Sequence, residues 1–228
     1  YGWVWAIPRT SHWTAMACED AGFAVRDVMT HVFGTGFPKS RALLKPAAEH
    51  WILIKAPGEL RELRIEENRI GTEMVGWGGG AAGGVTWTSD NCGLAKTGEA
   101  RPVAGRWPAN FALSHSDDCG DECTDDCPVR ELNEQSGDCP SGGGNKNVRN
   151  RDQRNAFGKG LGKGNGWGIG GDSGGASRFF YQAKPSTKER SAGLPDRNSH
   201  PTVKSIALMR HLIRLVAAPG SLILDPFT

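Results

Sequence analysis

The chain has 228 residues and a formal net charge of +2, from 27 basic and 25 acidic residues. Its length allows one large domain or two small ones, and the near-neutral charge gives no sign of nucleic-acid binding through overall charge. No signal peptide is present, and no apolar stretch approaches the roughly eighteen residues of a membrane-spanning helix. We therefore expect no membrane association and a reducing, cytoplasmic setting, in which six cysteines favour a metal over disulfides.

The first part of the chain, residues 1–57, has the pattern of an α/β core. Residues 3–7 are a continuous apolar run, typical of a strand buried on both faces. Ser11 is expected to cap a helix that runs to about residue 21. Residues 26–33 and 50–56 are predicted strands, rich in valine and isoleucine. Strand, helix, strand and strand in this order indicate an α/β fold.

Residues 58–195 differ from the rest in composition. They contain most of the 32 glycines, a number about twice that expected from the usual frequency of 7%. Their hydrophobic periodicity is weak, but scattered tryptophans and phenylalanines predict partial packing. Residues 142–175 are of low complexity and are expected to be mobile without a partner.

A basic run covers residues 145–163, with six basic residues and one acid, Asp152. Such a run is either a solvated loop or a surface that contacts DNA phosphates and releases their counterions. The basic residues are Lys146, Arg149, Arg151, Arg154, Lys159 and Lys163. Arg9 and Lys39 follow strand-like runs and are further candidates for phosphate contact, with solvated charges as the alternative.

The last segment, residues 196–228, contains the clearest α/β unit of the chain. Apolar residues between 203 and 216 follow helical spacing, and Pro219-Gly220 ends the predicted helix. Residues 221–224 are predicted to form a buried strand that ends at Asp225.

A histidine and three cysteines recur every fourth residue, interleaved with six acidic residues. They are His115, Cys119, Cys123 and Cys127. A single helix would spread these side chains over about 18 Å, too far to converge on a tetrahedral zinc with bonds near 2.3 Å. A zinc site therefore needs a turn-rich knuckle, which Gly120 and Pro128 permit, with Cys139 as a possible substitute ligand. The alternative is an acidic loop with free thiols.

Other isolated histidines and cysteines carry weaker signals. His12 and His31 each stand alone near apolar positions, which favours structural roles. Cys18 and Cys92 are expected to be ordinary thiols.

The order of several motifs resembles a known family. Residues 200–204, His-Pro-Thr-Val-Lys, precede the predicted helix, and residues 222–228, Leu-Ile-Leu-Asp-Pro-Phe-Thr, follow it. This arrangement is similar to the cofactor-binding start of permuted S-adenosylmethionine-dependent DNA amino-methyltransferases of phage or prophage type, in which the catalytic motif comes first and the cofactor-binding strand last. Further similar segments lie at residues 4–13, 33–40, 45–51, 105–110 and 172–181.

This resemblance implies roles for individual residues. The cofactor-binding residues implied are Asp225, Pro226, Phe227, His200, Thr202 and Lys204. The family usually has proline after the lysine, whereas this chain has Ser205, which is expected to loosen the start of the helix. The family's catalytic motif, Asp or Ser followed by Pro-Pro-aromatic, occurs nowhere in the chain. We therefore assign no catalytic residue, expect truncation at both ends with the motif before Tyr1, and expect this fragment alone to be inactive.

The implied fold is α/β: a partial Rossmann-like methyltransferase sheet, mixed by an antiparallel strand, with a large irregular glycine-rich target-recognition insertion. Residues 1–57 form core segments, 58–195 the recognition region, and 196–228 the cofactor-binding helix and first strand. The implied activity is methylation of an exocyclic amine of adenine, less favourably cytosine, in duplex DNA, within a restriction-modification setting. Two alternatives stay open: a non-catalytic zinc-dependent nucleic-acid-binding module, and a methyltransferase of this fold that acts on RNA or protein. The sequence specifies no oligomeric state.

Overall fold

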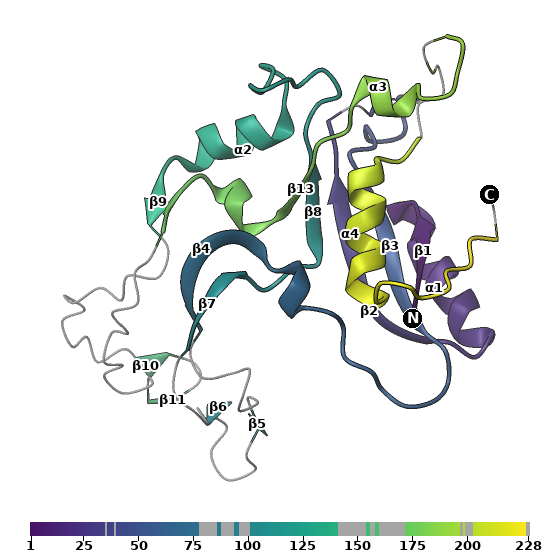
Figure 1. The fold of residues 1–228 in the computed structure, drawn as a ribbon, viewed down its shortest axis with the longest axis vertical. Coiled ribbons are helices and arrows are strands. Elements are labelled where there is room, and N and C mark those ends of the chain that lie inside the picture. Colours follow the sequence, from purple (N-terminus) through teal and green to yellow (C-terminus); the bar gives the residue numbers. More distant parts are fainter. Residues whose placement is uncertain are drawn as a thin grey trace. The chain divides into compact units, whose positions relative to one another are not determined.

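The computed structural model of the protein (Figure 1) describes residues 1–34, 36–38, 40–77, 86–87, 94–95, 101–140, 154–155, 158–159, 172–196, 198 and 203–226. The chain divides into two compact units. Unit 1 comprises Tyr1–Ile70, Trp107–Gly137 and Gly175–Thr228, and unit 2 comprises Gly71–Arg106 and Asp138–Gly174. No helix within the described ranges is long and apolar enough to cross a membrane.

A mixed five-stranded sheet forms the centre of unit 1, in the order β1-β3-β2-β8-β13. Its strands are β1 (Gly2–Ala6), β2 (Ala24–Val32), β3 (Ala48–Lys55), β8 (Phe111–Ser114) and β13 (Tyr181–Ala183). β3 is antiparallel to both β1 and β2, whereas β8 is parallel to both β2 and β13. The predicted mixed α/β sheet is confirmed. Its last two strands come from within residues 58–195, where the sequence predicts no strand.

The first strand and helix differ in detail from the predictions. β1 lies at an edge of the sheet and Trp5 is 44% exposed, so burial on both faces was wrong for residues 3–7. A short 3-10 helix, Pro8–Thr10, precedes α1 (Ser11–Asp20), and the N-cap of α1 is Thr10. Ser11 is therefore not the cap: it lies in the first turn, because the 3-10 turn leads directly into the helix, and its hydroxyl donates to the Pro8 carbonyl (3.1 Å).

Alternation along the strands divides the core of unit 1 between the two faces of the sheet. On one face, Met29, Trp51 and Ala112 pack against Leu208 and Leu212 of α4 (Ile206–Val216). The neighbouring positions point to the other face, where α1 packs on a second cluster. That cluster contains Ala6, Ile52 and Ile54. The same face carries a third cluster at β8 and α2 (Pro128–Ser136). Unit 1 is thus a sheet between helical layers.

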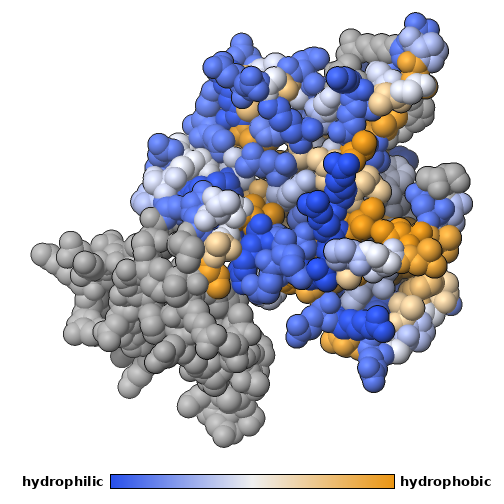
Figure 2. Space-filling model, viewed as in Figure 1, coloured by the Kyte–Doolittle hydropathy of each residue, from blue (hydrophilic) through white to orange (hydrophobic). Residues whose placement is uncertain are grey.

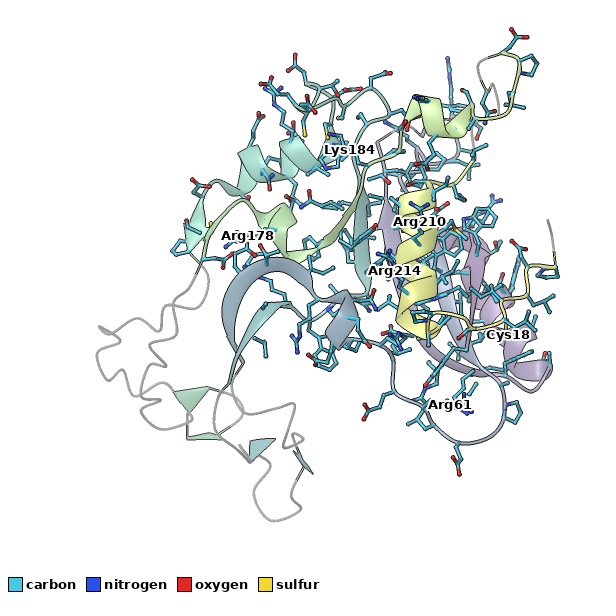
Figure 3. All side chains as sticks on the ribbon, in the orientation of Figure 1. Cys18, Arg61, Arg178, Lys184, Arg210 and Arg214 are labelled. Carbon is cyan, nitrogen blue, oxygen red and sulfur yellow. The ribbon has the colours of Figure 1, made fainter. Side chains whose placement is uncertain are left out.

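Helix α4 is amphipathic and its start is well defined. Ser205 is its N-cap, is buried, and accepts a hydrogen bond from the Leu208 amide (3.4 Å). The expectation that Ser205 loosens the start of the helix was therefore wrong, because its hydroxyl satisfies one of the free amides of the first turn. Arg210 and Arg214, labelled in Figure 3, are exposed on the outer side of the helix.

The chain beyond α4 does not form the predicted buried strand. Residues 221–225 have no strand pairing, and Leu222 and Leu224 are 100% and 86% exposed. A strand needs a partner for its backbone hydrogen bonds, and none is provided here among the described residues. Figure 2 shows hydrophobic side chains gathered on the surface of unit 1 over β1, α1 and this segment.

Shorter elements complete the two units. Unit 1 also contains the 3-10 helices Glu66–Asn68 and Ala176–Phe179, and α3 (Thr187–Arg190). Unit 2 is built from paired short strands: β4 (Ile70–Trp77) with β7 (Arg101–Arg106), β5 (Thr86–Trp87) with β6 (Leu94–Ala95), β9 (Cys139–Pro140) with β12 (Ser173–Gly174), and β10 (Arg154–Asn155) with β11 (Gly158–Lys159). Arg106 forms ion pairs with Glu73 and Asp172.

His211 links the stability of this core to pH. Its ring stacks on Tyr181, with centroids 3.8 Å apart and an interplanar angle of 5°. Its Nε2 atom is buried without a hydrogen-bond partner among the described residues. Burial, followed by the charge of Arg214, lowers the pKa of His211 from 6.5 to about 4. Between pH 6.5 and about 4, this imidazole is therefore neutral in the folded protein but protonated in the unfolded chain.

We expect the free energy of unfolding to fall as the pH is lowered from 6.5 to 4, with His211 contributing up to about 3 kcal/mol of that loss. The variant His211→Phe keeps the stacked ring and removes the titration. Urea unfolding at a series of pH values should show a smaller loss for the variant. Equal pH dependence of the two proteins would contradict this role.

Candidate functional site

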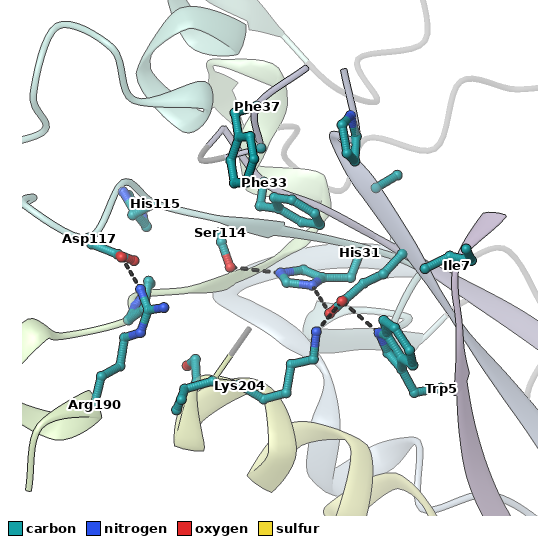
Figure 4. A pocket seen from close by; sticks show the side chains of 17 residues that line it. Trp5, Ile7, His31, Phe33, Phe37, Ser114, His115, Asp117, Arg190 and Lys204 are labelled. Carbon is teal, nitrogen blue, oxygen red and sulfur yellow. Dashed lines mark hydrogen bonds and ion pairs between the residues drawn. The ribbon is translucent and has the colours of Figure 1, made fainter. Parts of the chain in front are cut away.

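A cavity of about 250 Å³ lies in unit 1 at one edge of the sheet (Figure 4). The segments that follow β1, β2, β8 and β13 all contribute to it, through Ile7, Phe33, His115 and Pro185. These four strands run in the same direction, so their carboxyl ends meet at this edge. In open α/β sheets, ligands bind beyond the carboxyl ends of the strands. Its position therefore makes the cavity the candidate functional site.

A buried carboxylate, Glu49, organises one wall of the cavity (Figure 4). Its Oε1 atom lies 2.8 Å from Nδ1 of His31, and its Oε2 atom accepts a hydrogen bond from Nε1 of Trp5 (2.7 Å). Lys204, just before α4, forms an ion pair with the same carboxylate. The second ring nitrogen of His31 lies 2.7 Å from the Ser114 hydroxyl. The network thus connects β1, β2, β3, β8 and the start of α4.

Strand alternation explains why these side chains meet. His31 is two residues after Met29, Glu49 is two before Trp51, and Ser114 is two after Ala112. Met29, Trp51 and Ala112 all belong to the core cluster beneath α4. Residues two apart on a strand face the same side. The apolar face that packs on α4 therefore becomes polar where the strands reach the cavity.

The charge of Glu49 is stabilised despite its burial. Burial alone would raise its pKa, but the hydrogen bonds from His31, Lys204 and Trp5 and the charge of Lys204 outweigh it and lower the pKa from 4.5 to about 2. A buried carboxylate is tolerated when its oxygens are hydrogen-bonded and a cation is close. Near neutral pH, the wall therefore carries a fixed ion pair.

Aromatic side chains form the rest of the cavity. Trp5, Phe33 and Phe37 line it, and Phe37 is 58% exposed. Lys204 Nζ lies 4.9 Å from the centroid of the Trp5 ring, a cation–π contact. An ion pair between Asp117 and Arg190 lies at another part of the wall. Flat apolar surfaces beside a few fixed polar groups are typical of small-molecule sites.

A second cluster lies in the segment that follows β8. The ligand atoms of His115, Cys119, Cys123 and Cys127 all lie within 4.8 Å of one another. Burial, followed by the neighbouring Cys127 and Cys119, raises the pKa of the Cys123 thiol to about 11. Turns rather than a helix connect these residues up to Pro128. The structure brings all four together, as a zinc knuckle requires. Cys139 does not belong to the group: it is exposed in β9.

The other residues singled out in the sequence fall into two sets. Among the cofactor candidates, Lys204 lines the cavity, whereas Asp225 and Pro226 are exposed and do not. Arg9 is exposed in the 3-10 helix before α1. The remaining positions lie outside the described residues, or have only their backbone described. These are His200, Thr202, Phe227, Lys39, Lys146, Arg149, Arg151, Arg154, Lys159 and Lys163.

Comparison with known proteins identifies the family. A family model described as DNA methylase, for N6 and N4 positions, matches residues 3–228. The chain belongs to the DNA methylase family. No curated protein and no solved structure matches it. The match covers nearly all of this DNA methylase, including both β8 and β13, so the cavity lies within the family region. Members of the family methylate amino groups of DNA bases.

Sequence reasoning did not single out Glu49 or Ser114, which lie in the cavity network of this DNA methylase. It expected His31, like His12, to be structural, and the structure places His31 between Glu49 and Ser114. One signal was present for Glu49: it is two residues from Trp51, so it faces the same side of a strand in which residues 51–54 are buried. An acid on a buried face implies a partner.

Glu49→Gln is expected to destabilise this DNA methylase by roughly 3 kcal/mol at neutral pH, because it leaves Lys204 without its buried counter-ion. Glu134→Gln is the matched control: Glu134 pairs with Arg130 on the surface, where the two side chains are 58% and 41% exposed, and should have little effect. The contribution of the charged Glu49 is complete above pH 4.5 and disappears as the pH falls to about 2.

Urea unfolding of both variants and of the wild type, at neutral pH and at acidic pH, measures this effect. The difference between the wild type and Glu49→Gln should shrink below pH 4.5. Equal destabilisation by the two substitutions at neutral pH would show that Glu49 is no more important than a surface carboxylate.

Proposed function

We propose that this DNA methylase transfers the methyl group of S-adenosylmethionine to an exocyclic amine in duplex DNA, with adenine favoured over cytosine. The observation that carries the proposal is the cavity at the carboxyl ends of four codirectional strands, within the region matched by the DNA methylase family. This is the edge at which α/β sheets bind ligands. When bound, S-adenosylmethionine supplies an activated methyl group, and the protein supplies orientation and a polar environment.

The residues of the cavity suit a purine ring. Phe33, Phe37 and Trp5 provide flat apolar surfaces, and the Glu49–Lys204 pair provides fixed charges beside them. Both the adenosine group of the cofactor and a target adenine carry such a ring. Base amines are buried in duplex DNA, so a target base must leave the stack to react, which costs a few kcal/mol. An aromatic cavity offsets part of this by stacking.

Lys204 supports a link between the family resemblance and the cavity. It is the fifth residue of the His-Pro-Thr-Val-Lys segment, and it fixes Glu49 at the cavity wall. We propose that His200 and Thr202 act with it in cofactor binding. Asp225, Pro226 and Phe227 stay proposed cofactor residues on the basis of the resemblance alone.

We propose that target recognition resides within residues 58–195. Parts of this range, 58–70, 107–137 and 175–195, contribute to unit 1, so we assign recognition mainly to unit 2, which includes the basic run at residues 145–163. Arg9 and Lys39 are proposed as further DNA contacts. The family match over nearly the whole chain favours DNA as substrate over RNA or protein, and favours an enzyme over a non-catalytic zinc module.

The proposal is tested by methyl transfer. Protein from the complete reading frame, incubated with labelled S-adenosylmethionine, is expected to label duplex DNA and not RNA or protein. Mass spectrometry of the digested nucleosides should find N6-methyladenine, whereas N4-methylcytosine would reassign the base. Labelling of RNA or protein in preference to DNA would contradict the proposal.

Phe37→Ala is expected to weaken binding of the purine-bearing ligand about tenfold or more, since stacking on an aromatic side chain contributes about 1–3 kcal/mol per base. Phe37→Tyr keeps the ring and should restore binding. Phe23→Ala is the matched control, because Phe23 is 38% exposed and does not line the cavity.

Calorimetric titration with S-adenosylmethionine and binding assays with duplex DNA separate the two possible occupants. Weaker cofactor binding would place the cofactor's adenine beside Phe37, and weaker DNA binding alone would place the target base there. If Phe37→Ala and Phe23→Ala behave alike with both ligands, the cavity does not bind a purine.

Reversing the charge of Arg149, Arg151 and Arg154 together is expected to weaken DNA binding and flatten its salt dependence, because each lost phosphate contact removes about 0.9 from the slope of log K against log salt. The matched control reverses Arg41, Arg61 and Arg210, which are exposed in unit 1. Fluorescence anisotropy with a labelled duplex at several salt concentrations measures both. Equal slopes for the two triple variants would mean that the basic run has no special role.

A further inference from the structure

Three thiols and one imidazole converge in the knuckle, the segment His115–Cys127. Nδ1 of His115 lies 3.3 Å from the sulfur of Cys123 and 3.5 Å from that of Cys127, and all four ligand atoms lie within 4.8 Å of one another. Tetrahedral Zn²⁺ with bonds of about 2.0–2.3 Å holds its ligand atoms roughly 3.5 Å apart. The knuckle therefore has nearly the dimensions of a closed four-ligand zinc site.

The backbone of the knuckle explains how ligands four residues apart meet. The Cys119 amide donates to the Ser116 carbonyl, and the Cys127 amide donates to the Thr124 carbonyl, both at 3.1 Å. Each of these two cysteines thus closes a tight turn instead of continuing a helix. Pro128 then begins α2. Because turns take the place of a helix here, the ligands are not separated by the roughly 6 Å per four residues that a helix would impose.

Burial separates the sulfurs from the carboxylates. Cys119 and Cys127 are buried in the core cluster with Leu113 and Val129. Most of the interleaved acids are exposed, namely Asp118, Asp121, Glu122, Asp125 and Asp126. The acids therefore face solvent, while the soft ligands that Zn²⁺ prefers face one another inside. Free thiols can also be buried, as small apolar groups, so it is the convergence of the four ligand atoms, rather than burial alone, that favours a metal.

A further contact supports His115 as a metal ligand. Gln182 of β13 hydrogen-bonds the His115 ring, and Gln182 is itself held by its amide, which donates to the Ser177 carbonyl (2.9 Å). Metal-bound histidines commonly use their other ring nitrogen for such a bond, which fixes the orientation of the ring. Nδ1 of His115 faces the sulfurs of Cys123 and Cys127.

We propose that His115, Cys119, Cys123 and Cys127 bind one structural Zn²⁺, and that this ion holds one wall of the cavity in place. His115 directly follows Ser114, whose hydroxyl bonds His31 in the cavity. The His115 amide donates to the Ala183 carbonyl (2.9 Å), which extends the β8–β13 pairing into the knuckle. With four protein ligands the ion has no open position, so its role is structural rather than catalytic.

Other contacts connect the knuckle, or the residue directly after it, to neighbouring segments of unit 1. Asp117 pairs with Arg190 of α3, and both line the cavity. Lys184, labelled in Figure 3, donates to the Gly120 carbonyl. Gly34, just after β2, packs so closely on Pro128 that a Cβ atom there would lie 2.9 Å from the proline ring. Residues just after β2 and β13, and a residue of α3, are therefore positioned against the knuckle.

The first test is metal binding by the wild-type protein with its thiols reduced. Zn²⁺ is expected at about one equivalent, and replacement by Co²⁺ should give the intense visible bands and thiolate charge-transfer absorption of a tetrahedral sulfur-rich site. His115→Cys should keep the metal and increase the charge-transfer absorption, because it supplies a fourth thiolate. Less than half an equivalent in the wild type, or octahedral Co²⁺ spectra, would overturn the proposal.

Cysteine variants locate the site. Cys123→Ser should lower the affinity for Zn²⁺ by at least tenfold in a competition titration with a chromophoric chelator. Cys139→Ser is the matched control, because Cys139 is exposed in unit 2, and it should bind Zn²⁺ like the wild type. Equal loss in both variants, or no loss in either, would contradict the assignment.

The second part of the proposal is tested without a substrate. Removing the metal with a chelator should increase amide hydrogen exchange in β8, in the knuckle and around Gly34, while the β1–β3 pairing stays protected. Re-addition of Zn²⁺ should restore protection. Metal binding with unchanged exchange in β8 and around Gly34 would overturn the link to the cavity wall, and this result is independent of methyl-transfer activity.

Discussion

The buried carboxylate of Glu49 determines how the cavity of this DNA methylase is built. It lies where β3 begins, and it receives hydrogen bonds or charge from residues on β1, on β2 and before α4. Burial of a charge is unfavourable unless every oxygen is satisfied. These segments are therefore constrained to meet at one point, and the aromatic side chains around that point become the walls of a cavity rather than part of the core.

The same constraint explains why the helix after the cavity starts where it does. Lys204 must reach Glu49, and the next residue, Ser205, caps α4 with its buried hydroxyl. A cap at this position fixes the first turn, and Leu208 and Leu212 then face the sheet. The ion pair at Lys204, the cap at Ser205 and the apolar face that begins at Leu208 thus follow one another along one short segment. Serine at this position accomplishes locally what a proline would do by restricting the backbone.

In unit 1, β2, β3 and α4 could be predicted because they bury continuous or periodic apolar runs. β1 and α1 were also predicted, although β1 is a partly exposed edge strand and α1 buries no residue. β8 and β13 were not predicted, since strands of four and three residues carry too little periodicity and lie in a glycine-rich context. The predicted strand at residues 221–224 did not form. An apolar run indicates that a segment tends to be buried, but it does not indicate which strand will pair with it. Long-range pairing is the information that a local pattern lacks.

The candidate sites show the same division. The spacing of His115 and the three cysteines predicted a possible metal site, and helix geometry required turns between them, which the structure contains. Glu49 and Ser114 were not singled out, because they are far apart in the sequence and meet His31 only when β2, β3 and β8 pair. Lys204 was singled out by resemblance alone, and the structure places it at the cavity.

The chain leaves unit 1 for unit 2 twice, at residues 70–107 and at residues 137–175, and returns each time to the same sheet layer or to its flanking segments. The entropy of closing such an excursion grows only with the logarithm of its length, by about 0.6 kcal/mol per doubling. The stability of the sheet and its cavity therefore depends only weakly on the lengths of these two segments. Insertions and deletions there can alter what the protein contacts while the folded core stays the same, which makes unit 2 the part of the molecule most free to diversify.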